Sequence, residues 1–209
     1  MISLARLLKG PPLTLVALAV VSVAVAGCTR PLGGSDTPSR FYVLTAEPAQ
    51  TSAQPRSGAA QGPIVGVSRA ELADYLKREA IVTRSTGNEV ILADQDNWAA
   101  ELEDNVSLVL AENLSNMIPS ERVILLPSSR TIPLDYRVEV AISTFEQGPD
   151  GTVVLSAVWQ VFKGDDYGLL SMRKSTIRQP VTGEGYDAIV AAMSKALGEL
   201  SREISGQIR

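Results

Sequence analysis

One residue in this chain has distinctive chemistry: Cys28 is the only cysteine, and histidine is absent from all 209 residues. Without histidine, the Ser-His-Asp and Cys-His forms of nucleophilic catalysis are excluded. A single cysteine can form neither a zinc thiolate set nor an internal disulfide. Carboxylate or Ser-Lys chemistry has no supporting motif, so we expect no enzyme, no cofactor and no metal site. The chemistry to explain is that of Cys28.

The residues before Cys28 have the order of an export signal. Arg6 and Lys9 supply positive charge, and an apolar, small-residue run of 14 residues extends from Leu13 to Ala26. That run is shorter than the roughly 20 residues that cross a bilayer as a helix. The tetrad Val-Ala-Gly-Cys that ends at Cys28 resembles the lipobox of bacterial lipoproteins. The resemblance implies cleavage before Cys28, diacylglycerol on its thiol and an acyl chain on the new amine. An ordinary secretory signal with an incidental cysteine is the alternative.

This interpretation divides the chain into a signal peptide at 1–27, a tether at 28–39 and a folded domain at 40–209. Removal of the signal leaves 17 basic and 23 acidic residues, a net charge of −6. That balance argues against nucleic acid as a partner. The residue after Cys28 is Thr29 rather than Asp. By resemblance to enterobacterial sorting, this favours the outer membrane of a Gram-negative bacterium, with the domain facing the periplasm.

The first part of the domain is predicted to contain short strands and one long loop. The tether reaches about 35 Å when fully extended at roughly 3.3 Å per residue. Aromatic and β-branched residues predict a strand at 41–44, whereas 45–63 is rich in Ala, Gln, Ser, Gly and Pro and is predicted to be a flexible loop. Further strands are expected at 64–67, 81–84 and 89–93, the last two joined by the turn Thr86-Gly87-Asn88.

Two segments have helical periodicity. In the first, Asp96 or Asn97 is predicted to cap the helix and Pro119 to end it. Its apolar positions are spaced by three and four residues: Leu102, Val106, Val109, Leu110, Leu114, Met117 and Ile118. The second segment extends from Tyr186 to Ile208 over about six turns and is amphipathic.

Between the helices, alternating residues predict a meander of three strands, at 136–143, 152–162 and 169–178. The middle strand has apolar residues on both faces, so it is predicted to be central and covered on both sides. Trp159 lies in this strand and is expected to be a core residue. Together the elements predict an α+β fold, in which an antiparallel-rich (mixed) sheet is packed by two long amphipathic helices, the C-terminal helix last.

A few polar and aromatic residues outside this pattern could bind or react. Asp74, Glu103 and Asp104 are interpreted as solvated, capping or ion-paired carboxylates rather than as acid–base groups. Trp98 lies near a loop and could stack on a ligand, although packing is the commoner role. The basic residues of the same region could touch lipid headgroups or form solvated surface. They are Arg69, Lys77, Arg78 and Arg84.

Several short motifs together resemble the PqiC-type, or ABC-type transport auxiliary, lipoproteins over about residues 40–208. After the lipobox, the motifs occur in this order: Phe41-Tyr42-Val43-Leu44, Ile64-Val65-Gly66-Val67, Asp74-Tyr75-Leu76-Lys77-Arg78, Ile81-Val82-Thr83-Arg84, Trp98, Leu102-Glu103-Asp104-Asn105, Leu110-Ala111-Glu112-Asn113-Leu114, Tyr136-Arg137-Val138-Glu139-Val140, Tyr186-Asp187 and Met193-Ser194. The loop at 45–63 is longer than this pattern leads one to expect. The resemblance carries over one chemical site, Cys28, through the lipobox.

The resemblance implies a non-catalytic subunit of a system that moves lipids between the inner and outer membranes. Its partners would be an MCE (mammalian cell entry) domain periplasmic protein and the inner-membrane transporter of that protein, and the docking role allows a homo-oligomeric ring. The alternative is a monomeric envelope lipoprotein that binds a ligand or assists envelope assembly.

Overall fold

The computed structural model describes residues 38–48, 62–118, 120–128, 132–164 and 168–208, which belong to one compact unit that begins at Pro38. The predicted signal peptide at 1–27 and most of the tether lie outside the described residues. The elements of the unit, in chain order, are β1 Arg40–Tyr42, β2 Val65–Val67, β3 Glu71–Leu72, a 3₁₀ turn Asp74–Leu76, β4 Ala80–Arg84, β5 Val90–Trp98, α2 Leu102–Met117, β6 Val123–Leu125, β7 Tyr136–Gln147, β8 Thr152–Lys163, β9 Gly168–Pro180 and α3 Gly185–Ser205.

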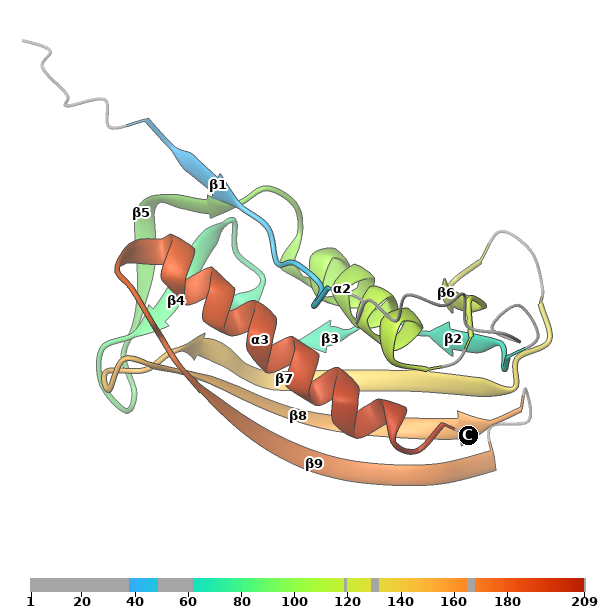
Figure 1. Cartoon of the computed structure of the whole chain (residues 1–209). Helices are drawn as coiled ribbons and strands as arrows, with labels where there is room; N and C mark the ends of the chain where they lie inside the picture. Colours follow the sequence, from blue (N-terminus) through green and yellow to red (C-terminus); the bar gives the residue numbers. More distant parts are fainter. Residues whose placement is uncertain (1–37, 49–61, 119, 129–131, 165–167, 209) are drawn as a thin grey trace, which may run out of the picture. The chain divides into compact units, whose positions relative to one another are not determined.

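The strands form one mixed sheet whose central strand is β7 (Figure 1). From β7, one branch continues through β4 and β5 to β1, a second through β2 to β6, and a third through β8 to β9, while β3 also pairs with β7. Among the described residues five strand pairings are parallel: β1–β5, β2–β6, β2–β7, β3–β7 and β4–β7. Three are antiparallel: β4–β5, β7–β8 and β8–β9. The α+β class with two long helices is therefore confirmed, but the prediction of an antiparallel-rich sheet is wrong.

The error has a physical cause. Antiparallel pairing in hairpins and meanders can be predicted from the turn residues between neighbouring strands. Gly151, which has a φ of 72°, is such a residue between β7 and β8. The parallel pairings join strands that are far apart in the chain, such as β2 and β7. No local pattern encodes such a partner, because parallel strands need a crossover connection rather than a turn.

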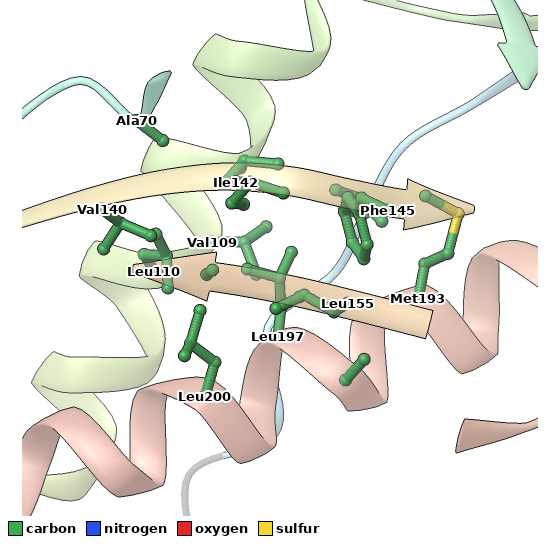
Figure 2. Close-up of a cluster of buried hydrophobic side chains, with 14 of the residues drawn as sticks. Ala70, Val109, Leu110, Val140, Ile142, Phe145, Leu155, Met193, Leu197 and Leu200 are labelled. Carbon is green, nitrogen blue, oxygen red and sulfur yellow. The ribbon is translucent and has the colours of Figure 1, made fainter. Parts of the chain in front are cut away.

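Both helices lie on one face of the sheet, and their apolar stripes form the core with that face. Figure 2 shows the packing of Leu110 from α2 and of Leu197 and Leu200 from α3 against Val140 and Leu155 of β7 and β8. Helix α2 ends at Met117, two residues before Pro119, as predicted. Helix α3 ends at Ser205, one turn earlier than the apolar periodicity suggests, and Ile208 is still buried.

Two further predictions are corrected by the structure. Asp96 and Asn97 do not cap α2, because both lie in β5 and the helix begins at Leu102. Strand β8 lies between β7 and β9, as predicted, but is covered on one side only: Val153 and Leu155 are buried, whereas Val158 on the opposite face is exposed.

Candidate functional site

The first described strand is fixed to the domain by a buried carboxylate. Asp96 of β5 is buried, and its Oδ1 lies 2.7 Å from Nε of Arg40 in β1. The Tyr42 hydroxyl donates to the same oxygen at 2.9 Å, and a second Arg40 nitrogen donates to Oδ2 at 2.9 Å. The hydrogen bond to Asp96 raises the pKa of Arg40, and burial raises the pKa of Tyr42. The strand that follows the predicted tether is therefore tied to β5 by charge as well as by backbone pairing.

Beyond β1, the chain continues as an extended strap between the two helices, residues 43–48, which we call the anchoring strap. Its backbone is held by side chains rather than by a strand. The Leu44 N–H donates to Asn105 Oδ1 at 2.6 Å, and the Thr45 N–H donates to Ser194 Oγ at 3.1 Å. Asn105 projects from α2 and Ser194 from α3, so the strap joins both helices.

The far end of the strap is held in the same way. The Glu47 N–H donates to Asn113 Oδ1 at 2.8 Å, and Asn116 Nδ2 donates to the Glu47 carbonyl at 3.1 Å. The Glu47 carboxylate pairs with Arg202 of α3 at 2.7 Å. A Cβ at Gly198 would overlap the Glu47 side chain, so the absence of a side chain there makes room for the strap. A pull on the N-terminal segment would consequently act on the helices that cover the core.

A groove of about 810 Å³ opens between β1 and the start of α2. Phe41 and Trp98 line it, together with the basic residues Lys77 and Arg78. Trp98 is buried, so it forms part of the groove wall rather than an exposed stacking platform. The groove is the described site that best suits the ligand role weighed for Trp98.

The four basic residues of the sequence prediction do not form one patch. Nε of Arg69 lies 2.8 Å from Oδ1 of Asp104, and Nζ of Lys77 lies 3.1 Å from Oε1 of Glu103. These pairs confirm that Glu103 and Asp104 are ion-pair partners, and Asp74 joins them through Lys77 at 3.3 Å. Because these carboxylates surround Arg69 and Lys77, the region is a poor site for anionic lipid headgroups.

Arg84 belongs to a different cluster, centred on Glu146 of β7. Glu146 is 1% exposed, and its Oε1 lies 2.6 Å from a guanidinium nitrogen of Arg84. The Tyr75 hydroxyl donates to Oε2 at 2.9 Å. Burial and the charge of Glu146 raise the pKa of Tyr75 to about 12. The cluster fastens the 3₁₀ turn and the β4–β5 hairpin to β7.

The outer face of the meander, opposite the helices, is covered at Glu146 by Arg84 and Tyr75 but is exposed to solvent around Val158 and Met172. This outer face carries Ala141 of β7, Val158 of β8 and Met172 of β9, and Val158 and Met172 are 38% and 57% exposed. A shallow groove of about 260 Å³ crosses it, between Arg69 and Glu71 on one side and Val158 and Gln160 on the other. Polar side chains lie among the apolar ones on this face, since Val158 is opposite Lys174 and Met172 is opposite Gln160. An uncovered sheet face that exposes apolar side chains is a candidate interaction surface. By contrast, Trp159 of the same strand is a core residue, as predicted, and its Nε1 donates to Ser175 Oγ at 2.9 Å.

The described ranges contain no cluster of three or more acidic, Cys or His side chains that could hold a metal ion. Neither described helix is long and apolar enough to cross a membrane. Cys28, the predicted lipidation site, lies outside the described residues.

The anchoring strap at 43–48 was not predicted from the sequence, although one residue of α2 indicated that something packs there. Asn113 falls on the apolar face of α2, three residues after Leu110 and one before Leu114, and it is fully buried. A buried polar side chain needs a hydrogen-bond partner. Asn113 therefore indicates that another part of the chain lies against this helix, without saying which part.

Comparisons with known proteins agree with this architecture. The family model described as the ABC-type transport auxiliary lipoprotein component matches residues 42–205. Two crystal structures share the fold, each with a TM-score of 0.65. One, of an uncharacterized protein, is 20% identical and covers 81% of this chain and 97% of its own. The other, a Xanthomonas campestris protein of family model DUF330, is 17% identical and covers 80% and 93%.

A more distant structure is the PelC dodecamer from Paraburkholderia phytofirmans, with 14% identity, a TM-score of 0.39 and coverage of 68% of this chain and 90% of its own. The search of curated proteins found no match.

Proposed function

Because the chain belongs to the family of ABC-type transport auxiliary lipoprotein components, we propose that it is the membrane-anchored docking subunit of a system that transports lipid between the inner and outer membranes. The role is non-catalytic. In support, the family is described as an auxiliary component, and the chain has no histidine for a Ser-His-Asp or Cys-His site. The family supplies the auxiliary role, and the lipid cargo follows from the sequence resemblance.

The anchor in this proposal is Cys28. Cleavage before it and acylation of its thiol and amine would hold the domain on a membrane, because two or more acyl chains give stable anchoring where one does not. Thr29 favours the outer membrane, with the domain in the periplasm. The Asp96 cluster and the anchoring strap support this role, since they connect the first described residues to the core through charged and amide side chains.

The observation that carries the docking role is the solvent-exposed part of the outer face of the meander. Val158 and Met172 are exposed beside Lys174, whereas on the opposite face Leu155, Trp159 and Val161 of β8 are buried. Folding alone does not require apolar residues at these positions. We assign this face to an MCE-domain periplasmic protein, which in turn works with an inner-membrane transporter. End-on docking of this kind also allows a ring of identical copies. The ring would be ruled out if the mature protein stayed monomeric at micromolar concentration even with its partner.

The test is affinity purification of the tagged lipoprotein from mildly solubilised native membranes, read by mass spectrometry. Recovery of an MCE-domain protein in stoichiometric amount, together with an acylated Cys28 peptide, is the expected result. Recovery of the acylated lipoprotein alone would leave the anchor intact and remove the transport role. A Cys28→Ser variant is the matched control for anchoring, because it keeps the folded domain and loses the acylation site.

The groove beside Trp98 favours a second function, that of a monomeric lipoprotein that binds a ligand. Its volume of about 810 Å³ lies within the range of small-molecule sites. Native mass spectrometry of the purified protein would show a bound lipid or other small molecule under this alternative. A Trp98→Ala variant would then lose the bound mass, whereas a Trp98→Phe variant would retain part of it.

A further inference from the structure

Strand β9 lies at the border of the sheet, and one of its two edges is unpaired in the described part of the chain. It extends over 13 residues and pairs with β8 alone (Figure 1). The strands at the other borders, β1 and β6, have three residues each. An unpaired edge presents a row of backbone N–H and C=O groups, so β9 is a long template for another extended segment.

The charged side chains of β9 are all positive. Arg173, Lys174 and Arg178 are exposed, and neither β8 nor β9 contains an acidic residue. This is a local excess of positive charge, because the chain from Cys28 onward has a net charge of −6. The edge of β9 is therefore complementary in charge to an acidic segment.

These three cations remain available to a partner. Lys174 has no ion pair or side-chain hydrogen bond among the described residues. Arg173 lies over the ring of Trp159, 6.0 Å from its centroid, and stays exposed. Arg178 lies 3.5 Å from Asp150, but both side chains are more than half exposed, so this pair contributes little.

The acids of α3 that lie beside β9 do not neutralise it. Glu199 accepts a hydrogen bond from Gln179 at 2.6 Å, and Glu203 accepts one from the Ser175 hydroxyl. Neither forms an ion pair with a basic residue of β9 in the described structure. These contacts hold β9 against α3 through its inner face and leave its edge open.

The other end of the strand is apolar, which distinguishes β9 from an edge that is only protected by charge. Leu169, Leu170 and Met172 are exposed there. Charges along a border strand commonly prevent association, whereas exposed apolar residues favour it. An edge with a basic part and an apolar part therefore suits a partner that is acidic in one part and apolar in the other.

A second copy of this chain fits the edge poorly. Pairing of β9 with β9 would bring basic side chains near one another, which is unfavourable. The border strands β1 and β6 of a second copy are much shorter than β9. Anionic lipid headgroups would satisfy the cations but would not pair with the backbone of the edge. A strand from another protein satisfies both.

We propose that the free edge of β9 binds an extended acidic segment of a partner protein, which adds a strand to the sheet. In antiparallel register, two acidic residues four positions apart would lie opposite Arg178 and Lys174. A third would lie opposite Arg173, and an apolar residue opposite Met172. Binding at this edge does not depend on which transport system the lipoprotein serves, so it can be tested apart from the MCE-domain protein.

The experiment measures binding of a defined peptide to the full lipoprotein in a neutral detergent. The probe is fluorescein-labelled Glu-Val-Thr-Val-Glu-Glu-Leu, whose acids match Arg178, Lys174 and Arg173 in antiparallel order. We expect saturable binding by fluorescence anisotropy and slower hydrogen exchange at 172–178. Lys174→Glu should weaken binding about tenfold, because an attraction becomes a repulsion. Lys195→Glu, the same change at an exposed position of α3, should leave the affinity within about twofold.

A charge swap separates pairing at the edge from general attraction. The variant Lys174→Glu with Arg178→Glu, at an unchanged unfolding midpoint, should lose the first peptide and bind Lys-Val-Thr-Val-Lys-Glu-Leu. If the midpoint falls, Lys174→Gln with Arg178→Gln replaces this variant and should bind the two peptides equally. A swap that does not restore binding, or neutral substitutions that leave the preference for the first peptide intact, would overturn the proposal.

Three further results would also overturn it. The first is the absence of saturable binding up to millimolar peptide, or binding without slower exchange in β9. The second is protection of β9 that rises with lipoprotein concentration alone, which would identify a second copy as the occupant. The third is protection of β9 by phosphatidylglycerol vesicles but not by the peptide, which would identify lipid.

Discussion

The two faces of the meander differ sharply although the same strands form both. On the inner face, Leu155, Trp159 and Val161 of β8 lie under the helices and are fully buried. On the outer face of the same strand, Val158 is exposed, and Met172 of β9 lies beside it on that face. The difference indicates that folding depends on the inner face, and under the proposed function the outer face is the one that binds a partner. Substitutions on the two faces should accordingly have separate effects, on stability and on docking.

The largest effect is expected on the inner face. Trp159→Ala removes a fully buried ring and the hydrogen bond to Ser175, and should lower the free energy of unfolding by about 3–5 kcal/mol. The matched control is Val158→Ala, one residue away on the outer face, for which a change within about 0.5 kcal/mol is expected. Chemical denaturation followed by circular dichroism measures both. Similar losses for the two variants would show that both faces are needed for folding.

Glu146 is an exception to the difference between the two faces, because it is a buried residue on the outer face of the sheet. It pairs with Val154 in the β7–β8 ladder, and Arg84 and Tyr75 cover it. Glu146→Ala should cost about 2 kcal/mol, since it removes a charge-assisted hydrogen bond to Arg84. Adding Arg84→Ala to Glu146→Ala should lower the free energy of unfolding no further, because the two residues act as one pair. Additive losses in a double-mutant cycle would contradict this coupling.

A smaller loss is expected from the strap. Asn113→Ala leaves the Glu47 N–H without its acceptor and should cost about 1 kcal/mol. Hydrogen exchange at Leu44–Glu47 should accelerate in the variant, while exchange in β8 stays unchanged. Ser115→Ala, at a partly exposed position of the same helix, is the control. Unchanged exchange in the strap would mean that Asn113 does not hold it.

A further effect, confined to high pH, is expected at Tyr75. The pKa of Tyr75 is raised to about 12 in the folded protein, whereas its ordinary value is 10.0. Between these values the folded state binds the proton and the unfolded state does not, so this contribution to stability is lost as pH rises. The difference in unfolding free energy between the wild type and Tyr75→Phe should therefore shrink from pH 10 toward pH 12. A difference that stays constant would show that the phenol titrates alike in both states.

Elements with strong local periodicity could be predicted from the sequence, and long-range contacts could not. The spacing of Leu102, Val106 and Leu110 was sufficient for α2, and alternation at Tyr136, Val138 and Val140 was sufficient for β7. Asp96 has the residue type of a helix cap, but a guanidinium 56 residues away and a phenol 54 residues away bind it instead. Apolar residues on both faces of β8 suggested two covering layers, whereas one face is exposed. In both cases a partner from elsewhere decided the role, and a local pattern cannot name that partner.

The candidate functional residues likewise include some that a contiguous motif identifies and some that only long-range contacts identify. The lipobox around Cys28 is a contiguous motif and could be predicted, although Cys28 lies outside the described residues. The strap depends on Asn105, Asn113 and Ser194 meeting one extended segment, and the outer face depends on which sheet surface the helices leave uncovered. These are properties of the assembled fold.

The proposed docking of the partner on the outer face is tested most directly by one pull-down. The doubly substituted lipoprotein, Val158→Glu with Met172→Glu, should fold, because position 158 lies opposite Lys174 and position 172 opposite Gln160. Purified from native membranes with an unchanged unfolding midpoint and acylated Cys28, it should lose the MCE-domain protein that the wild type recovers. Recovery of that protein in the same amount by the substituted lipoprotein would contradict the account.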